Sequence, residues 1–103
     1  MIVRTWRARA AKDRPEDYQR HFDTVVVPHL ESLAGFCGAL LLRREVADGL
    51  EYLVATRWES LDAVKGFAGE DYTRAVVEPG AIAALESFDD TVIHYEVISR
   101  LGT

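Results

Sequence analysis

The chain has 103 residues, of which 49% are hydrophobic and 28% charged, a composition typical of one globular domain rather than of a disordered segment. Its formal net charge is −5 and it has no basic stripe with interleaved aromatic residues, so we do not expect nucleic-acid binding. One cysteine, Cys37, excludes an intrachain disulfide. The sequence shows neither a membrane-length apolar run nor the apolar core of a signal peptide, so we expect one cytoplasmic domain over residues 1–103 without membrane association.

The first third of the chain predicts a strand followed by a helix. Residues 2–10 are typical of a strand, and a helix is expected to begin near Pro15, since proline is favoured in the first helical turn. Apolar residues then recur at steps of three and four, which predicts a buried stripe consisting of Tyr18, Phe22, Val25, His29 and Leu33. Pro28 removes one helical hydrogen bond and disfavours helical geometry at Val27, so we expect a kink or a break there.

The rest of the chain predicts a hairpin, a second helix and a final strand. Asp48-Gly49 is a strong hairpin signal between strands at 36–46 and about 51–58. Ser60 is a suitable N-cap for a helix over 61–68 that would end at Gly69. The remaining elements are expected to be a short helical piece around 71–77, another turn over 81–85 and a last strand over 91–100.

This order predicts a ferredoxin-like β-α-β-β-α-β fold of the α+β class, in which helices cover one face of an antiparallel sheet. Two strands carry apolar residues on both faces, whereas a half-solvated strand alternates apolar and polar residues. In the strand over 36–46, alternation places Phe36, Leu40 and Leu42 on one face and Leu41 on the other. The last strand divides Val92 and Ile98 from Ile93, Tyr95 and Val97. A second cover is therefore needed, and pairing of two sheets in a homodimer is the simplest one.

No strong catalytic motif occurs. A phosphate loop, a dinucleotide fingerprint, a zinc-binding HExxH and a Gly-x-Ser-x-Gly elbow are all missing. The three histidines are far apart in the sequence and show no metal-ligand spacing. We therefore expect no metal and no cofactor.

His94 and His21 are the candidate catalytic bases, because the pKa of histidine lies near working pH. His94 shares one face of the last strand with Val92, and His21 lies at the edge of the helical stripe. For His94, a structural imidazole paired with a neighbouring carboxylate is the alternative. His29, inside the stripe, is more typical of a core histidine or a helix-end cap.

Four aromatic side chains are candidate walls of a binding site for a flat ring: Trp6, Trp58, Phe67 and Tyr72. Simple core packing is the alternative for each of them. They favour a small aromatic or hydrophobic molecule as the ligand.

Residues 56–61 (TRWESL), followed by 67–71 (FAGED) and 75–77 (AVV), resemble the antibiotic biosynthesis monooxygenase domain of the dimeric α/β barrel superfamily. So does the pattern of Tyr18, His21-Phe22, Pro28 and Leu30, followed by Gly35-Phe36. The likeness covers nearly the whole chain. It implies a homodimer.

The family includes cofactor-free oxygenases that convert anthrones or quinols to quinones, and enzymes that degrade haem. Haem-degrading members use an asparagine on the first strand, a tryptophan on the second main helix and a histidine shortly after it. Those positions correspond roughly to Thr5, Phe67 and Val76, so none of the three residues is retained. The resemblance thus implies a cofactor-independent monooxygenase acting on a small electron-rich aromatic of the quinol or anthrone type. The alternative is a non-catalytic homodimer that binds a small ligand or has a structural role.

Overall fold

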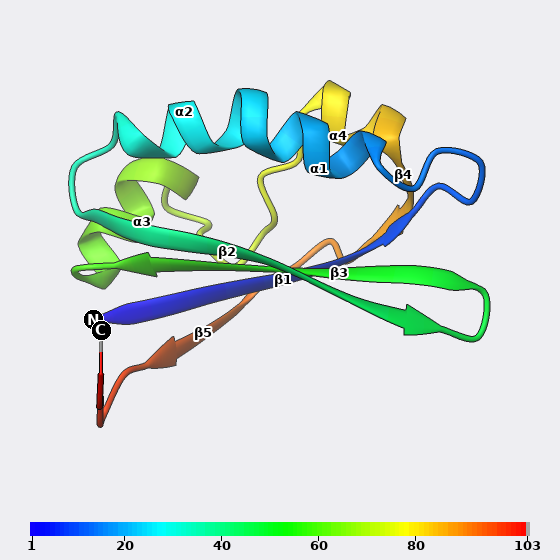
Figure 1. Cartoon of the computed structure of the whole chain (residues 1–103). Helices are drawn as coiled ribbons and strands as arrows, with labels where there is room; N and C mark the ends of the chain where they lie inside the picture. Colours follow the sequence, from blue (N-terminus) through cyan, green and yellow to red (C-terminus); the bar gives the residue numbers. More distant parts are fainter. Residues whose placement is uncertain (103) are drawn as a thin grey trace.

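The computed structural model describes residues 1–102, which form a five-stranded antiparallel sheet with helices on one face (Figure 1). The strands are β1 (Ile2–Ala10), β2 (Phe36–Val46), β3 (Gly49–Trp58), β4 (Leu85–Phe88) and β5 (Ile93–Glu96). They follow the order β2-β3-β1-β4, and β5 pairs with the beginning of β1 on the same edge as β4. The helices are α1 (Asp17–His21), a π-helical turn η1 (Phe22–Val26), α2 (Val27–Glu31), α3 (Leu61–Ala68) and α4 (Pro79–Ala84). The ferredoxin-like α+β fold predicted from the sequence is confirmed.

The predicted hairpin is present, but a β-bulge changes the face that one residue occupies. β2 and β3 meet at the pair Val46 and Gly49, so β3 begins two residues before the predicted start. Near the other end, Phe36 pairs with Trp58 and Gly38 with Arg57, which leaves one extra residue in β2. The bulge turns Phe36 toward the helices. The predicted grouping of Phe36 with Leu40 and Leu42 is therefore wrong.

The helical segment over 17–31 buries Tyr18 and Phe22 as predicted, but its buried face differs from the prediction after Phe22, because its middle turn is π-helical. Val27 N–H donates to Phe22 O, five residues earlier, and this wider turn shifts all later side chains by about one position. Val26 and Leu30 therefore pack into the core in place of Val25, which is 43% exposed, and His29. The expected break at Val27 is wrong, because Val27 keeps helical dihedral angles and the irregular turn precedes it, whereas a kink there stays a prediction.

The second predicted helix is confirmed with its boundaries. Ser60 Oγ accepts a hydrogen bond from Ala63 N at 3.2 Å, and the helix α3 ends at Gly69, which has φ 85°. The helical piece expected around 71–77 is wrong, because this segment is pinned to residues 90–92. Ala75 N donates to Asp90 O and Val92 N donates to Thr73 O, both at 2.9 Å. These two hydrogen bonds hold the backbone of residues 73–75 in a non-helical conformation.

The end of the chain contains a strand that the sequence did not indicate and a shorter last strand than expected. The turn expected over 81–85 is the helix α4, and β4 follows it directly. The last strand spans only β5 instead of 91–100. β5 pairs with residues 2–5 of β1, and Val97 N donates to Met1 O just after the strand.

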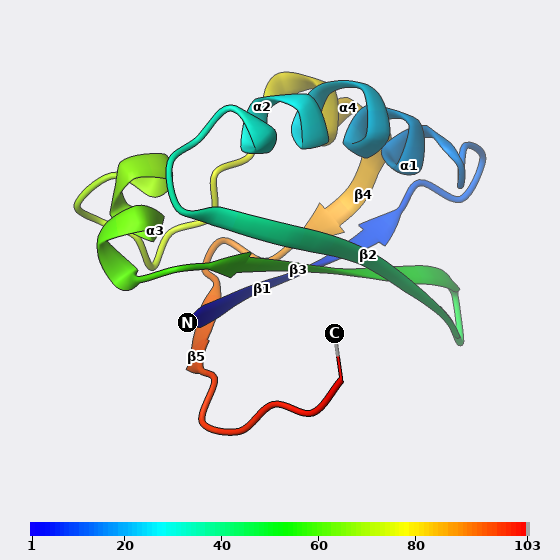
Figure 2. The ribbon, with the colours of Figure 1, turned by 60° about the vertical axis from the view of Figure 1, so that its left-hand side comes forward.

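The two faces of the sheet differ in their cover (Figure 2). The helices bury one face, with a core that includes Tyr18, Phe22 and Tyr52 near α1 and Leu30, Trp58 and Val64 near α3. On the opposite face no helix formed by residues 1–102 lies over the sheet, and four large apolar side chains are 45–60% exposed: Leu40, Leu42, Ile93 and Tyr95. Within residues 1–102, no helix has the length and apolar character needed to cross a membrane.

Candidate functional site

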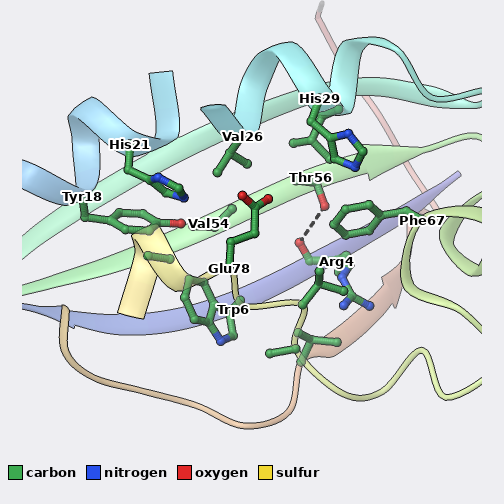
Figure 3. A pocket seen from close by; sticks show the side chains of 15 residues that line it. Arg4, Trp6, Tyr18, His21, Val26, His29, Val54, Thr56, Phe67 and Glu78 are labelled. Atoms are coloured by element: carbon green, nitrogen blue, oxygen red, sulfur yellow. Dashed lines mark hydrogen bonds between the residues drawn. The ribbon is translucent and has the colours of Figure 1, made fainter. Parts of the chain in front are cut away.

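A cavity lies between the sheet and the helices (Figure 3). It has a volume of about 60 Å³, and its walls come from β1, β3, the helical segment, α3, the chain over 75–78, α4 and Val92. Most of its fifteen lining residues are apolar. The polar and ionisable ones are Arg4, Tyr18, His21, His29, Thr56 and Glu78.

Strand alternation explains which strand residues reach the cavity. Successive side chains of a strand point to opposite faces, so every second residue of β1 and β3 points toward the helices. In the antiparallel register Arg4 pairs with Thr56 and Trp6 with Val54, and all four line the cavity. The sheet thus provides the floor of the site.

Arg4 is a buried cation at one end of the cavity, with only 5% of its surface exposed. Its Nη1 donates to Tyr72 O at 2.6 Å and its Nη2 to Arg74 O at 3.0 Å. The guanidinium also lies over the ring of Phe67, 5.7 Å from the centroid. Burial lowers the Arg4 pKa to about 10, so the side chain stays protonated at neutral pH.

His94 contacts Arg4 instead of lining the cavity. Its Nε2 lies 3.0 Å from Arg4 Nη1. A guanidinium only donates, so His94 Nε2 accepts and its proton resides on Nδ1. Burial and then the charge of Arg4 lower the His94 pKa. His94 is therefore held in its neutral form, and its partner is a guanidinium instead of the neighbouring carboxylate that the structural alternative named. Its predicted role as a base remains a prediction.

His21 lies in the cavity wall, and its Nε2 is buried without a hydrogen-bond partner among residues 1–102. The Tyr18 and His21 ring centroids are 6.1 Å apart, and Glu78 extends its carboxylate to the same side of the cavity (Figure 3). Burial, and after it the negative charge of Glu78, raises the pKa of the Tyr18 hydroxyl, which stays protonated. A buried polar atom without a partner is uncommon and points to a role that the folded chain alone does not fulfil.

The four predicted aromatic residues have different positions. Trp6 and Phe67 line the cavity. Trp58 is fully buried, donates from Nε1 to Thr56 Oγ1 at 2.8 Å and stacks on Phe67 with centroids 5.4 Å apart, so it supports the wall from behind. Tyr72 does not line the cavity but packs edge-on against His94 at 5.5 Å. Their roles in binding remain predictions.

The sequence did not identify Arg4, Glu78 or Tyr18 as residues of this site, although the Tyr18 hydroxyl faces the cavity (Figure 3). Arg4 had one usable signal, because it alternates in phase with Trp6 on the strand and a charged residue on an inward face is unusual. Glu78 had none, since it lies in a loop that only the tertiary fold brings to the cavity. Of the positions compared with haem-degrading members, Val76 lines the cavity whereas Thr5 is on the opposite side of the sheet from Arg4.

Metal ligands do not gather in the part of the chain that the structure describes. No three side chains of His, Cys, Asp or Glu within residues 1–102 come close enough together to hold an ion.

Comparison with known proteins gives a consistent set of relatives. The family model for the antibiotic biosynthesis monooxygenases matches residues 1–79. SnoaB, a cofactor-independent oxygenase from Streptomyces nogalater, is 17% identical over 99% of this chain and 97% of its own, with a TM-score of 0.68. The haem degrader MhuD of Mycobacterium tuberculosis, seen with two haems in its active site, is 22% identical over 99% and 100%, also with a TM-score of 0.68. No curated protein sequence matches the chain. At these identities the structural likeness shows the fold alone.

Proposed function

The chain belongs to the antibiotic biosynthesis monooxygenase family, and from that premise we propose that it is a cofactor-independent monooxygenase. Its substrate is a small electron-rich aromatic of the quinol or anthrone type, and O2 is the oxidant. The observation that carries the proposal is the buried, unpartnered Nε2 of His21 in the wall of an apolar cavity. A substrate proton is the partner that this nitrogen lacks.

The reaction starts with removal of a proton from the substrate by the base. The resulting anion passes one electron to O2, and the substrate radical and superoxide then combine to form a C–O bond. In an anthrone, the peroxide at the former CH2 carbon loses the remaining carbon-bound proton and its O–O bond breaks. One oxygen stays as the new carbonyl and the other leaves as water, so substrate and O2 supply all atoms and electrons.

The cavity residues suit the first step. His21 accepts the proton at Nε2, which has no other partner among residues 1–102. Trp6 and Phe67 provide apolar walls for a flat ring. The cavity of about 60 Å³ is smaller than the roughly 150 Å³ that accommodates benzene, so binding of an aromatic requires lining side chains to move apart.

His94 is the weaker of the two candidate bases. The lone pair of its Nε2 accepts from Arg4, and burial and the charge of Arg4 both disfavour the protonated form that a base must adopt. A base that cannot hold the proton it removes contributes little. We therefore assign the proton transfer to His21 and a positioning role toward Arg4 to His94.

We also propose that the protein is a homodimer joined through the open faces of its sheets. Leu40 is 60% exposed on β2, and Ile93 and Tyr95 are each 55% exposed on β5, which is separated from β2 by β3 and β1. Large apolar side chains exposed on one face of a sheet indicate a surface that a partner covers. A second copy would cover it by a symmetric contact.

The test is oxygen consumption with a panel of quinols and anthrones, run for the wild type, His21→Asn and His94→Asn. A positioned base contributes roughly 10²–10⁴-fold, so His21→Asn should lose most of the rate above the uncatalysed reaction. Equal rates in wild type and His21→Asn would remove His21 as the base, and a loss confined to His94→Asn would reinstate His94. Absence of turnover with every substrate would favour the non-catalytic, ligand-binding alternative.

A further inference from the structure

We infer that Arg4 makes one end of the cavity a binding subsite for an anionic oxygen, so that the ligand is an aromatic carrying a carboxylate or an ionised hydroxyl. This assignment deepens the proposed function by naming a feature of the substrate. Binding at the subsite does not require turnover.

The charge of Arg4 is not compensated within the described chain. Among residues 1–102, no carboxylate lies within 4 Å of the guanidinium, and all three of its hydrogen-bond partners are neutral: Tyr72 O, Arg74 O and His94 Nε2. Buried arginines are nearly always paired with an anion, because removing an unpaired charge from water is costly. The missing counter-charge is what a ligand would supply.

The guanidinium uses three of its five N–H groups in hydrogen bonds within residues 1–102. Nη1 uses its two N–H groups on Tyr72 O and His94 Nε2, and Nη2 uses one on Arg74 O. This leaves Nε–H and one Nη2–H without a partner in residues 1–102, and these N–H groups are available to donate to an anionic oxygen. Because Arg4 lines the cavity beside Phe67, an aromatic acid at this end would also have a ring to pack against.

The opposite side of the cavity carries the opposite charge. Glu78 extends its carboxylate toward Tyr18 and His21, whereas Arg4 lies beside Phe67 (Figure 3). An anionic group is repelled by Glu78 and attracted by Arg4, so the cavity orients a ligand that has one anionic end. The anion then lies at Arg4, and the proton that the base removes faces His21.

The first experiment compares a charged and an uncharged probe of the same shape on the wild-type protein. Benzoate and benzamide are titrated at pH 7 under argon, with tryptophan fluorescence as the readout because Trp6 lines the cavity. A charge-assisted hydrogen-bond pair predicts that benzoate binds about tenfold or more tightly than benzamide. Equal affinities, or tighter binding of benzamide, would overturn the assignment.

Two variants test the polarity of the cavity, because their effects on benzoate should be opposite. Arg4→Met should abolish the preference for benzoate, and Glu78→Gln should increase benzoate affinity while leaving benzamide affinity unchanged. Arg4 also holds the carbonyl groups of Tyr72 and Arg74, so circular dichroism must show that Arg4→Met is folded. If Arg4→Met is unfolded, the comparison of benzoate with benzamide on the wild type and the benzoate affinity of Glu78→Gln decide whether the subsite exists. A folded Arg4→Met that keeps the preference contradicts the inference.

A third probe separates the two sources of an anionic oxygen. 4-Nitrophenol ionises near neutral pH and changes its visible absorbance when it does, so a subsite for an ionised hydroxyl would lower its apparent pKa on binding. A lowered pKa of 4-nitrophenol together with weak benzoate binding identifies a phenolate ligand. Tight benzoate binding without a change in the 4-nitrophenol pKa identifies a carboxylate. If neither probe responds, Arg4 has only a structural role.

The anion subsite and the oxygenase activity can be rejected independently, because binding and oxygen consumption are measured separately. A benzoate preference without turnover of any substrate supports the anion subsite and rejects the oxygenase. Turnover of neutral substrates with no preference for benzoate supports the oxygenase and rejects the subsite.

Discussion

The imidazole ring of His21 lies directly over the α-carbon of Gly80. A β-carbon added to Gly80 would come within 2.8 Å of His21 Cε1 and 2.9 Å of Nδ1, closer than such atoms approach in proteins. Gly80 is in the first turn of α4, so the beginning of this helix sets the position of the proposed base. The contact couples a backbone position outside the cavity lining to a side chain inside it.

Gly80→Ala should therefore displace the His21 ring and lower the rate of oxygen consumption toward that of His21→Asn. The fold should survive, because alanine is favoured over glycine in a helix by about 1 kcal/mol, which offsets part of the steric cost. The rate is measured with whichever quinol or anthrone the wild type turns over, and the melting temperature is recorded alongside.

Gly66→Ala is the matched control. Gly66 lies in α3, and a β-carbon added there meets no atom within 4 Å, so the same substitution should leave the rate unchanged. If both variants lose activity equally, a general effect of the substitution accounts for the loss and the His21 contact does not.

A second prediction concerns stability at mildly acidic pH and depends on His94. Its pKa is lowered in the folded protein by burial and by Arg4, so the unfolded chain binds more protons below the ordinary histidine pKa of about 6.5. The free energy of unfolding should therefore decrease as the pH falls below about 6.5 and be independent of this group above it. Urea unfolding between pH 5 and 8 measures the slope. His94→Gln, which does not titrate, should have a shallower slope, and an unchanged slope would show that other groups cause it.

How much of this molecule could be predicted from the sequence depends on how local each signal is. The helix between Ser60 and Gly69 was predicted with its ends, because its cap and its stop are single residues next to the element. Position 36 was assigned to the wrong face because the bulge is visible only in the pairing of two strands. Likewise, the π-helical turn that buries Val26 in place of Val25 leaves no mark in the spacing of apolar residues.

The residues of the candidate site also divide into those that the sequence alone can indicate and those whose role depends on the tertiary fold. His21, Trp6 and Phe67 could be selected by residue type and by resemblance, and the structure places all three at the cavity. Arg4 and Glu78 could not, because their importance comes from which charges the fold brings together and which it leaves unpaired. Residue type also favoured His94, whose contact with Arg4, ninety residues away in the chain, is a property of the folded sheet alone.

A third prediction tests the N-cap of α3. Ser60→Ala removes the side-chain acceptor of the Ala63 N–H group and should destabilise the protein by about 1 kcal/mol. Chemical denaturation with an unchanged m-value would report this loss. Ser87→Ala, at an exposed position of β4 whose hydroxyl makes no hydrogen bond to another described residue, should change stability by less than about 0.5 kcal/mol. Similar losses for the two variants would contradict a capping role for Ser60.

The last prediction uses two neighbouring leucines of β2 that face opposite sides of the sheet. Leu40 is 60% exposed on the open face, whereas Leu41 packs against the core beneath the helices. An aspartate at position 40 would place a charge in the proposed dimer interface, where an unpaired buried charge is strongly unfavourable. Leu40→Asp should therefore yield a monomer with near-native circular dichroism. Leu41→Asp should instead lower the free energy of unfolding by several kcal/mol, because the charge is then buried within the subunit.

Light scattering coupled to size-exclusion chromatography at micromolar concentration measures the mass, and thermal unfolding measures the stability of each variant. A wild-type protein that is already a stable monomer would reject the dimer outright. A Leu40→Asp variant that stays dimeric would place the interface elsewhere. A carboxylate at position 40, on the edge strand β2 of the open face, cannot be covered by apolar residues of a second copy without a large desolvation cost.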